Sequence, residues 1–85
     1  MENKRILNAL YDEIVAPLEN YTDKTNTVDG MMSYAIIFHE VIINFTEKMN
    51  KNYVEMISKS PDKKEEINDY ITELHNKLIS TYKPK

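Results

Sequence analysis

The fold of this chain is decided by residues 31–45, which read MMSYAIIFHEVIINF. A helix built from this stretch carries apolar side chains nearly all the way round, and such a helix is normally buried on every side. The stretch is shorter than the roughly 20 apolar residues that cross a bilayer. His39 and Glu40 also lie at its middle, where ionisable groups are costly in lipid. It therefore predicts the central helix of a bundle and no membrane span.

The central helix is expected over residues 28–58, because apolar residues keep a spacing of three and four well beyond the apolar stretch. At about 1.5 Å per residue this helix is roughly 45 Å long. A heptad-like row on it forms the predicted core seam: Met31, Ala35, Phe38, Ile42, Phe45, Met49, polar Asn52 and Met56.

Two further helices are predicted on either side of the central one. The first is expected over residues 3–20, with a kink or break at Pro17, which cannot donate a helical hydrogen bond. A polar loop is expected over residues 22–27. The third is expected over residues 61–82, with Ser60 and Pro61 as its start signal. Their apolar rows are Leu7, Leu10, Ile14 and Leu18, widened by Ile6 and Tyr11, and Ile67, Ile71, Leu74, Leu78 and Tyr82.

These elements predict one all-α domain over residues 1–85, a three-helix antiparallel bundle with a long central helix. One glycine and three prolines in 85 residues favour long helices over a turn-rich β-fold. A domain of this size has a thin core. Because the chain has no cysteine and no paired histidine motif, neither disulfides nor zinc would support that core. Helix packing and self-association are the remaining sources of stability.

The net charge of −3 comes from acids and bases that alternate along the chain. A basic stripe typical of nucleic-acid binders is absent, so no nucleic-acid partner is expected. Acidic residues such as Glu2, Asp12 and Glu13 interrupt any apolar run near the N-terminus. We therefore expect no signal peptide and a cytoplasmic location.

No catalytic, cofactor-binding or metal-binding residues are predicted, and the chain is not expected to be an enzyme. On a helix His39 and Glu40 point about 100° apart, and Glu73 and His75 about 200° apart, so neither pair makes a joint metal ligand. Cysteine nucleophiles and glycine-rich phosphate loops are both absent. Each histidine is expected to be a structural or half-exposed side chain.

The apolar central helix supplies the candidate interface. Two other helices cover about two-thirds of its surface, and the uncovered strip is expected to contain Met32, Ile36, His39 and Ile43. Tyr53 is added as the tyrosine expected to be most exposed. The alternative is that these side chains are core residues, since a central helix is more buried than its neighbours. The interface interpretation predicts a protein partner, with a homo-oligomer, most simply a dimer, as its first form.

The predicted function is a non-enzymatic protein–protein interaction module, an adaptor, inhibitor or regulator, with Lys, Asn and Ile usage typical of a microbe or virus. One alternative is a homo-oligomer that sequesters a small anion, for which Lys4 and Arg5 are the candidate cations. Another rests on residues 10–14, Leu-Tyr-Asp-Glu-Ile. This stretch resembles the first helix of cytosolic class IIa bacteriocin immunity proteins, helical bundles of similar size with four helices. The resemblance implies a small immunity protein, but it covers five residues and does not identify the chain as a member.

Overall fold

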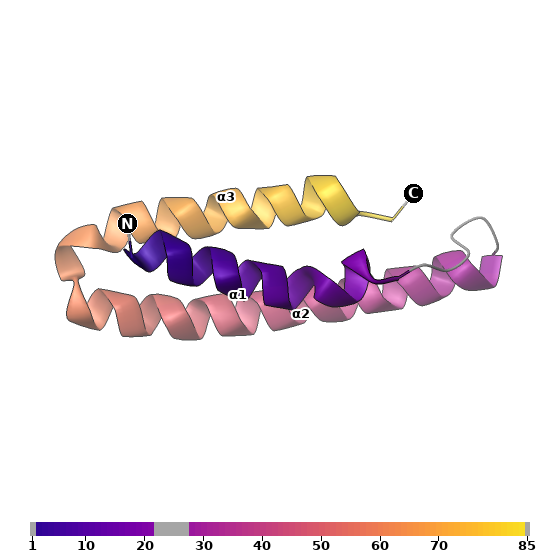
Figure 1. Ribbon diagram of the computed structural model, residues 1–85, viewed down its shortest axis with the longest axis horizontal. Helices are drawn as coiled ribbons and strands as arrows, with labels where there is room; N and C mark the ends of the chain where they lie inside the picture. Colours follow the sequence, from indigo (N-terminus) through magenta and orange to yellow (C-terminus); the bar gives the residue numbers. More distant parts are fainter. Residues whose placement is uncertain (1, 22–27, 85) are drawn as a thin grey trace.

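The computed structural model describes residues 2–21 and 28–84, with the backbone alone for residues 28–31. Its elements are α1 (Glu2–Glu19), α2 (Val28–Lys59), the 3-10 turn η1 (Pro61–Lys63) and α3 (Lys64–Tyr82) (Figure 1). No strand occurs within these ranges, and the predicted all-helical class is confirmed for them. The predicted loop over residues 22–27 and the side chain of Met31 lie outside the described residues.

The molecule is a rod of 48 × 18 × 17 Å, with α2 along its length and α1 and α3 beside it (Figure 1). The start of α1 and the turn between α2 and α3 lie at one end of the rod, and the end of α3 lies toward the other (Figure 1). Hydrogen bonds between helices agree with this arrangement. Tyr70 of α3 bonds to Asn8 of α1 near the first end, and Tyr82 bonds to Glu19 near the second.

All three helices contribute to one core. Its buried apolar side chains are Leu7, Tyr11, Ile14, Val15, Leu18, Val41, Phe45, Met49, Met56, Ile67, Leu74 and Leu78. The predicted seam of α2 supplies Phe45, Met49 and Met56, while Phe38 and Ile42 are half-buried at its margin. In α1 the stripe is displaced from the predicted one, because Val15 is buried and Ile6 is 42% exposed.

Of the predicted kink or break at Pro17, the break does not occur, since α1 continues to Glu19 without interruption; the kink stays a prediction. Pro17 has no N–H for the carbonyl four residues before it, but this removes only one hydrogen bond. The next turn is intact, because the Asn20 N–H donates to the Ala16 carbonyl at 2.9 Å. Burial of Val15 and Leu18 on either side of the proline also holds this last turn against the core.

The third helix begins differently from its predicted start. Pro61–Lys63 form a 3-10 turn, in which the Lys63 N–H donates to the Ser60 carbonyl at 3.0 Å, and α3 follows from Lys64. The Ser60 side chain makes no capping hydrogen bond. This turn separates α2 from α3 by only a few residues, and the two helices lie side by side (Figure 1).

Tyrosine hydroxyls connect the helices at the end of the rod where α3 stops. The Tyr34 hydroxyl of α2 donates to the backbone carbonyl of Tyr82. The Tyr82 hydroxyl in turn donates to the Glu19 carboxylate of α1 at 2.8 Å. The ring of Tyr21 lies 5.5 Å from that of Tyr34, centre to centre. This tyrosine link, made of Tyr34, Tyr82 and Glu19, joins all three helices.

Candidate functional site

The predicted interface strip is exposed on α2. Met32 is 61% exposed, Ile36 60% and Ile43 47%, and His39 between them is exposed as well. The steps between these residues are four, three and four, so they share one face of the helix. The alternative that they are core residues is therefore wrong for this structure. We call Met32, Ile36, His39 and Ile43 the outer strip; its role as an interface stays a prediction.

Tyr53 differs from the outer strip, and its expected exposure is wrong. It is half-buried and packs against the core. The reason is the geometry of a long helix: a row with a seven-residue repeat drifts by about 20° per heptad around a straight helix. Tyr53 lies three heptads after Met32 on the same row of α2. The row faces outward at Met32 and Ile36 and faces α3 at Tyr53.

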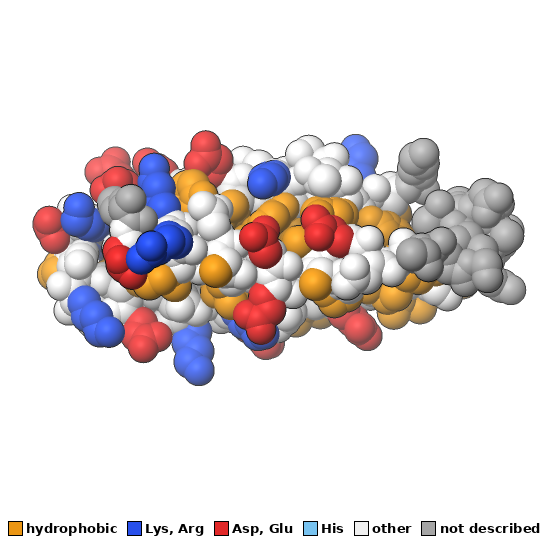
Figure 2. Space-filling model, in the orientation of Figure 1, with side chains coloured by type: hydrophobic (Ala, Val, Ile, Leu, Met, Phe, Trp, Pro, Cys, Tyr) orange, Lys and Arg blue, Asp and Glu red, His pale blue; other side chains and the backbone are white. Residues whose placement is uncertain are grey.

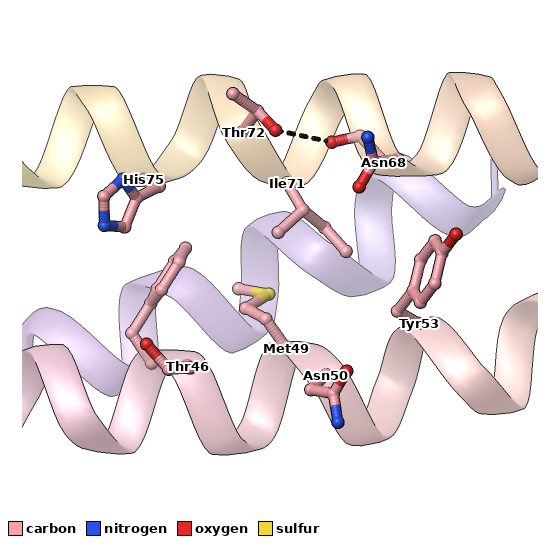
Figure 3. A pocket seen from close by; sticks show the side chains of 9 residues that line it. Thr46, Met49, Asn50, Tyr53, Asn68, Ile71, Thr72 and His75 are labelled. Atoms are coloured by element: carbon pink, nitrogen blue, oxygen red, sulfur yellow. Dashed lines mark hydrogen bonds between the residues drawn. The ribbon is translucent and has the colours of Figure 1, made fainter.

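At Tyr53 this row forms one wall of a hollow between α2 and α3, with a volume of about 320 Å³. We call it the α2–α3 hollow. Met49 and Ile71 point toward one another in its middle, between Tyr53 at one end and His75 at the other (Figure 3). The His75 ring lies 5.7 Å from the ring of Phe45, which also lines the hollow. Its remaining lining residues are Thr46 and Asn50 from α2, and Asn68 and Thr72 from α3.

Threonine hydroxyls and asparagine amides are among the polar groups that line the hollow. The Thr46 hydroxyl donates to the Ile42 carbonyl at 3.0 Å, and the Thr72 hydroxyl donates to the Asn68 carbonyl at 3.0 Å (Figure 3). Both hydroxyl protons are therefore engaged within their own helices. The side chains of Asn50 and Asn68 are exposed at the rim, where their amides can donate and accept hydrogen bonds.

The outer strip and the hollow form a face without formal charge along its α2 side. The α2 row passes through the outer strip and the hollow and ends one turn beyond the hollow. It consists of Met32, Ile36, His39, Ile43, Thr46, Asn50, Tyr53 and Ile57, none of which is Asp, Glu, Lys or Arg. Both histidines of the chain, His39 and His75, belong to this face. On the face drawn in Figure 2, by contrast, acidic and basic side chains gather toward the end where α2 and α3 join. We call the combined surface the uncharged face.

The cations proposed for anion binding are engaged elsewhere. Arg5 forms an ion pair with Glu2 at 3.2 Å, and the Lys4 ammonium lies 5.2 Å from the centre of the Tyr70 ring. Among the described residues, no group of three or more acidic or histidine side chains could hold a metal ion. The polar groups of the uncharged face are amides, hydroxyls and imidazoles.

The sequence interpretation misses an exposed apolar residue beside this face, Val54, and the part of the face that α3 contributes. Val54 is 55% exposed and lies 18 residues after Ile36, which is five turns of a helix with 3.6 residues per turn. That spacing is visible in the sequence and places both side chains on one outward line. The contribution of α3, through Asn68 and His75, depends on how α3 packs on α2, and no local pattern specifies it.

Within the described residues no helix is apolar over enough length to cross a membrane. Comparisons of the chain with models of known protein families, with curated proteins and with solved structures found no match.

Proposed function

We propose that this chain is a non-enzymatic protein–protein interaction module of the cytoplasm. In this proposal it is an antiparallel three-helix bundle that associates with copies of itself, most simply as a dimer, through the uncharged face. The observation that carries the proposal is the exposure of Met32, Ile36 and Ile43 on one face of α2. A contiguous apolar patch on a small protein usually marks an interaction surface, whereas single exposed apolar residues need no explanation.

The energetics support an interface at this place. Full burial of an Ile or Met side chain contributes about 1.5 to 3 kcal/mol, so completing the burial of Met32, Ile36 or Ile43 would contribute about 1 kcal/mol each. The bundle itself is thin, and small helical domains often gain stability by association. A partner that covers the outer strip would therefore stabilise both the complex and the fold of each copy.

The test is the molar mass in solution, by size-exclusion chromatography with light scattering over a range of concentrations. We expect a species of twice the 10.0 kDa of the chain. Replacing Ile36 and Ile43 together by Glu should give the monomer, because each carboxylate would have to lose water in the interface. Ile6→Glu is the matched control, since Ile6 is 42% exposed on α1, away from the uncharged face.

A wild-type protein that stays monomeric at every concentration would contradict self-association. The wider proposal then depends on a second readout, retention of another protein by the immobilised chain. If Ile36→Glu with Ile43→Glu abolishes this retention and Ile6→Glu leaves it, the face binds a different protein. If both variants retain the same proteins as the wild type, the uncharged face is not an interface. No contact in the described part of the chain favours the anion-sequestering or immunity-protein alternative, so we propose neither.

A further inference from the structure

We propose that the occupant of the uncharged face is a second copy of the chain in one particular pairing. The two α2 helices lie antiparallel, with their dyad axis near residues 44 and 45, and the outer strip of each copy lies on the α2–α3 hollow of the other. The inference rests on the proposed function, because it names the partner and the contacts of the same face. It assigns the hollow the role of a receptor site for the outer strip.

The first argument is the order of steps along the row. Positions 32, 36, 39, 43, 46, 50, 53 and 57 follow one another at steps of four, three, four, three, four, three and four residues. This order reads the same in both directions. When two copies are laid antiparallel, every position of one row therefore falls opposite a position of the other. Alternating steps of four and three residues therefore suit an antiparallel pair of helices, and a twofold axis makes each contact reciprocal, since residue i contacts residue j while j contacts i.

The second argument is the chemistry of the positions that meet. Across the dyad the row pairs Met32 with Ile57, Ile36 with Tyr53, His39 with Asn50, and Ile43 with Thr46. Two of these pairs are apolar, and a third brings Ile43 against the methyl group of a threonine. The remaining pair joins two polar side chains. Because an amide both donates and accepts, Asn50 can hydrogen-bond the imidazole of His39 in either protonation state.

The third argument is shape. The start of the row projects outward, with Met32 and Ile36 about 60% exposed, while its end is recessed beside α3, where Tyr53 and Ile57 are half-buried. Thr46 and Asn50, between these two ends, are exposed. An antiparallel pairing places the projecting start of one row on the recessed end of the other. A parallel pairing would bring the projecting starts together and leave the hollows facing each other unfilled, which forfeits packing contacts.

The fourth argument is charge and area. The molecule carries a net charge of −3, and the positions of the α2 row itself are uncharged, although the exposed residues Glu40 and Glu47 border one edge of the row. Side-by-side contact along a rod 48 Å long and 18 Å wide covers at most roughly 860 Å² on each copy, against about 800 Å² per partner in a standard interface. This upper limit applies to a whole side of the rod, and it is close to the area of a standard interface.

The test uses disulfide trapping, which has a clean background because the chain has no cysteine. The variants are His39→Cys and Asn50→Cys, both at exposed positions. In the proposed dimer, position 39 of one copy lies opposite position 50 of the other. Position 39 of one copy and position 39 of the other are separated along the helix axis by eleven residues, because position 39 of the second copy lies opposite residue 50 of the first. At 1.5 Å per residue this separation is roughly 16 Å, well beyond the reach of a disulfide. A glutathione redox buffer supplies the oxidant and keeps exchange reversible, so only cysteines held close together remain linked.

We expect a covalent dimer when the two variants are mixed, and no covalent dimer from either variant alone. Glu40→Cys mixed with Lys51→Cys is the matched control, since these exposed residues have the same separation of eleven but lie on another side of α2. This mixture should stay unlinked. Circular dichroism of each variant should match the wild type.

Three other outcomes would each contradict the proposed pairing, and each has a different meaning. Linkage of His39→Cys alone or Asn50→Cys alone would mean parallel α2 helices. A dimer by light scattering without linkage of the mixture would mean self-association through other contacts, so the pairing fails while the proposed self-association stands. A monomer by light scattering, with no linkage, would overturn both.

Discussion

The hydroxyl of Tyr82 donates a 2.8 Å hydrogen bond to the carboxylate of Glu19 and so joins the last turn of α3 to the last turn of α1. These residues are 63 positions apart in the sequence. Since the Tyr82 carbonyl also accepts the Tyr34 hydroxyl, this end of the bundle depends on polar contacts as well as on the core.

Tyr82→Phe should lower the free energy of unfolding by about 1 kcal/mol, the usual value for one hydrogen bond. Glu19→Gln should cost less, because its amide oxygen can still accept the Tyr82 hydroxyl. Urea unfolding followed by circular dichroism measures both changes. Glu13→Gln, at an exposed position of α1, is the control and should stay within about 0.5 kcal/mol of the wild type. If the free energy of unfolding of Tyr82→Phe equals that of the wild type, the hydrogen bond between Tyr82 and Glu19 does not contribute to stability in solution.

Stability should fall at alkaline pH. Burial, then the hydrogen bond and charge of Glu19, raise the pKa of Tyr82. Burial also raises the pKa of Tyr11, with Asp12 and Glu19 adding to it, and burial raises the pKa of Tyr34. The unfolded chain loses phenolic protons near pH 10, before the folded chain does. The stabilising contribution is therefore complete below about pH 10 and is lost as the pH rises above it.

The measurement is urea unfolding of the wild type and Tyr82→Phe between about pH 8 and pH 11.5. The difference in stability between the two proteins should narrow as the pH rises, because ionisation removes what the substitution has already removed. Lysine titration is common to both proteins and cancels in the comparison. If the difference in stability between the two proteins is the same at every pH in this range, ionisation of Tyr82 is not the cause of the loss of stability at alkaline pH.

Tyr11→Phe should leave stability unchanged or raise it by up to about 1 kcal/mol. Tyr11 is 3% exposed, and its hydroxyl finds no hydrogen-bond partner among the described residues. Removing an unsatisfied buried hydroxyl relieves a desolvation cost. The ring contacts stay: Phe45 lies edge-on at 6.5 Å between ring centres, and the Lys77 ammonium lies 5.1 Å from the ring centre. Thermal unfolding measures the change, and a clear loss of stability would mean that the hydroxyl has a partner in solution.

Leu78→Ala should lower the free energy of unfolding by about 2 to 5 kcal/mol, because Leu78 is fully buried and the substitution leaves a cavity. In a thin core this loss is a large fraction of the total. Ile36→Ala is the comparison, at a position 60% exposed within the chain. At concentrations where the protein is monomeric it should change stability by about 0.5 kcal/mol or less. Equal losses for the two variants would contradict the assigned burial.

Sequence patterns predict most of the helical framework. The central helix is expected over residues 28–58 and ends one residue later, because its apolar spacing is long and Pro61 limits it. The exposure of Ile36 and Ile43 also follows from the sequence, since two shorter helices cannot cover an apolar helix on all sides. Burial of Val41 and the recessed position of Tyr53 do not follow, because they depend on where α1 and α3 lie around α2.

The polar contacts between helices are harder to predict than the helices. Tyr82 follows Leu74 and Leu78 at helical spacing in the sequence, which predicts that its ring packs against the core. The spacing does not predict that its hydroxyl reaches Glu19. Such contacts join residues far apart in the chain, and only the assembled bundle brings them together. The α2–α3 hollow has the same origin, because its walls come from two helices.

The elongated shape of the bundle has a consequence for how the protein tumbles. All three helices follow the 48 Å axis of a rod only 18 × 17 Å thick (Figure 1), and the peptide dipoles of a helix lie roughly along its axis. Nearly every amide bond vector in the helices is therefore reoriented by end-over-end rotation, the slowest rotational mode. Backbone nitrogen relaxation should report a correlation time longer than that of a sphere of the same mass. A second rod laid alongside the first would thicken the particle without lengthening it, and rotational diffusion would become less anisotropic.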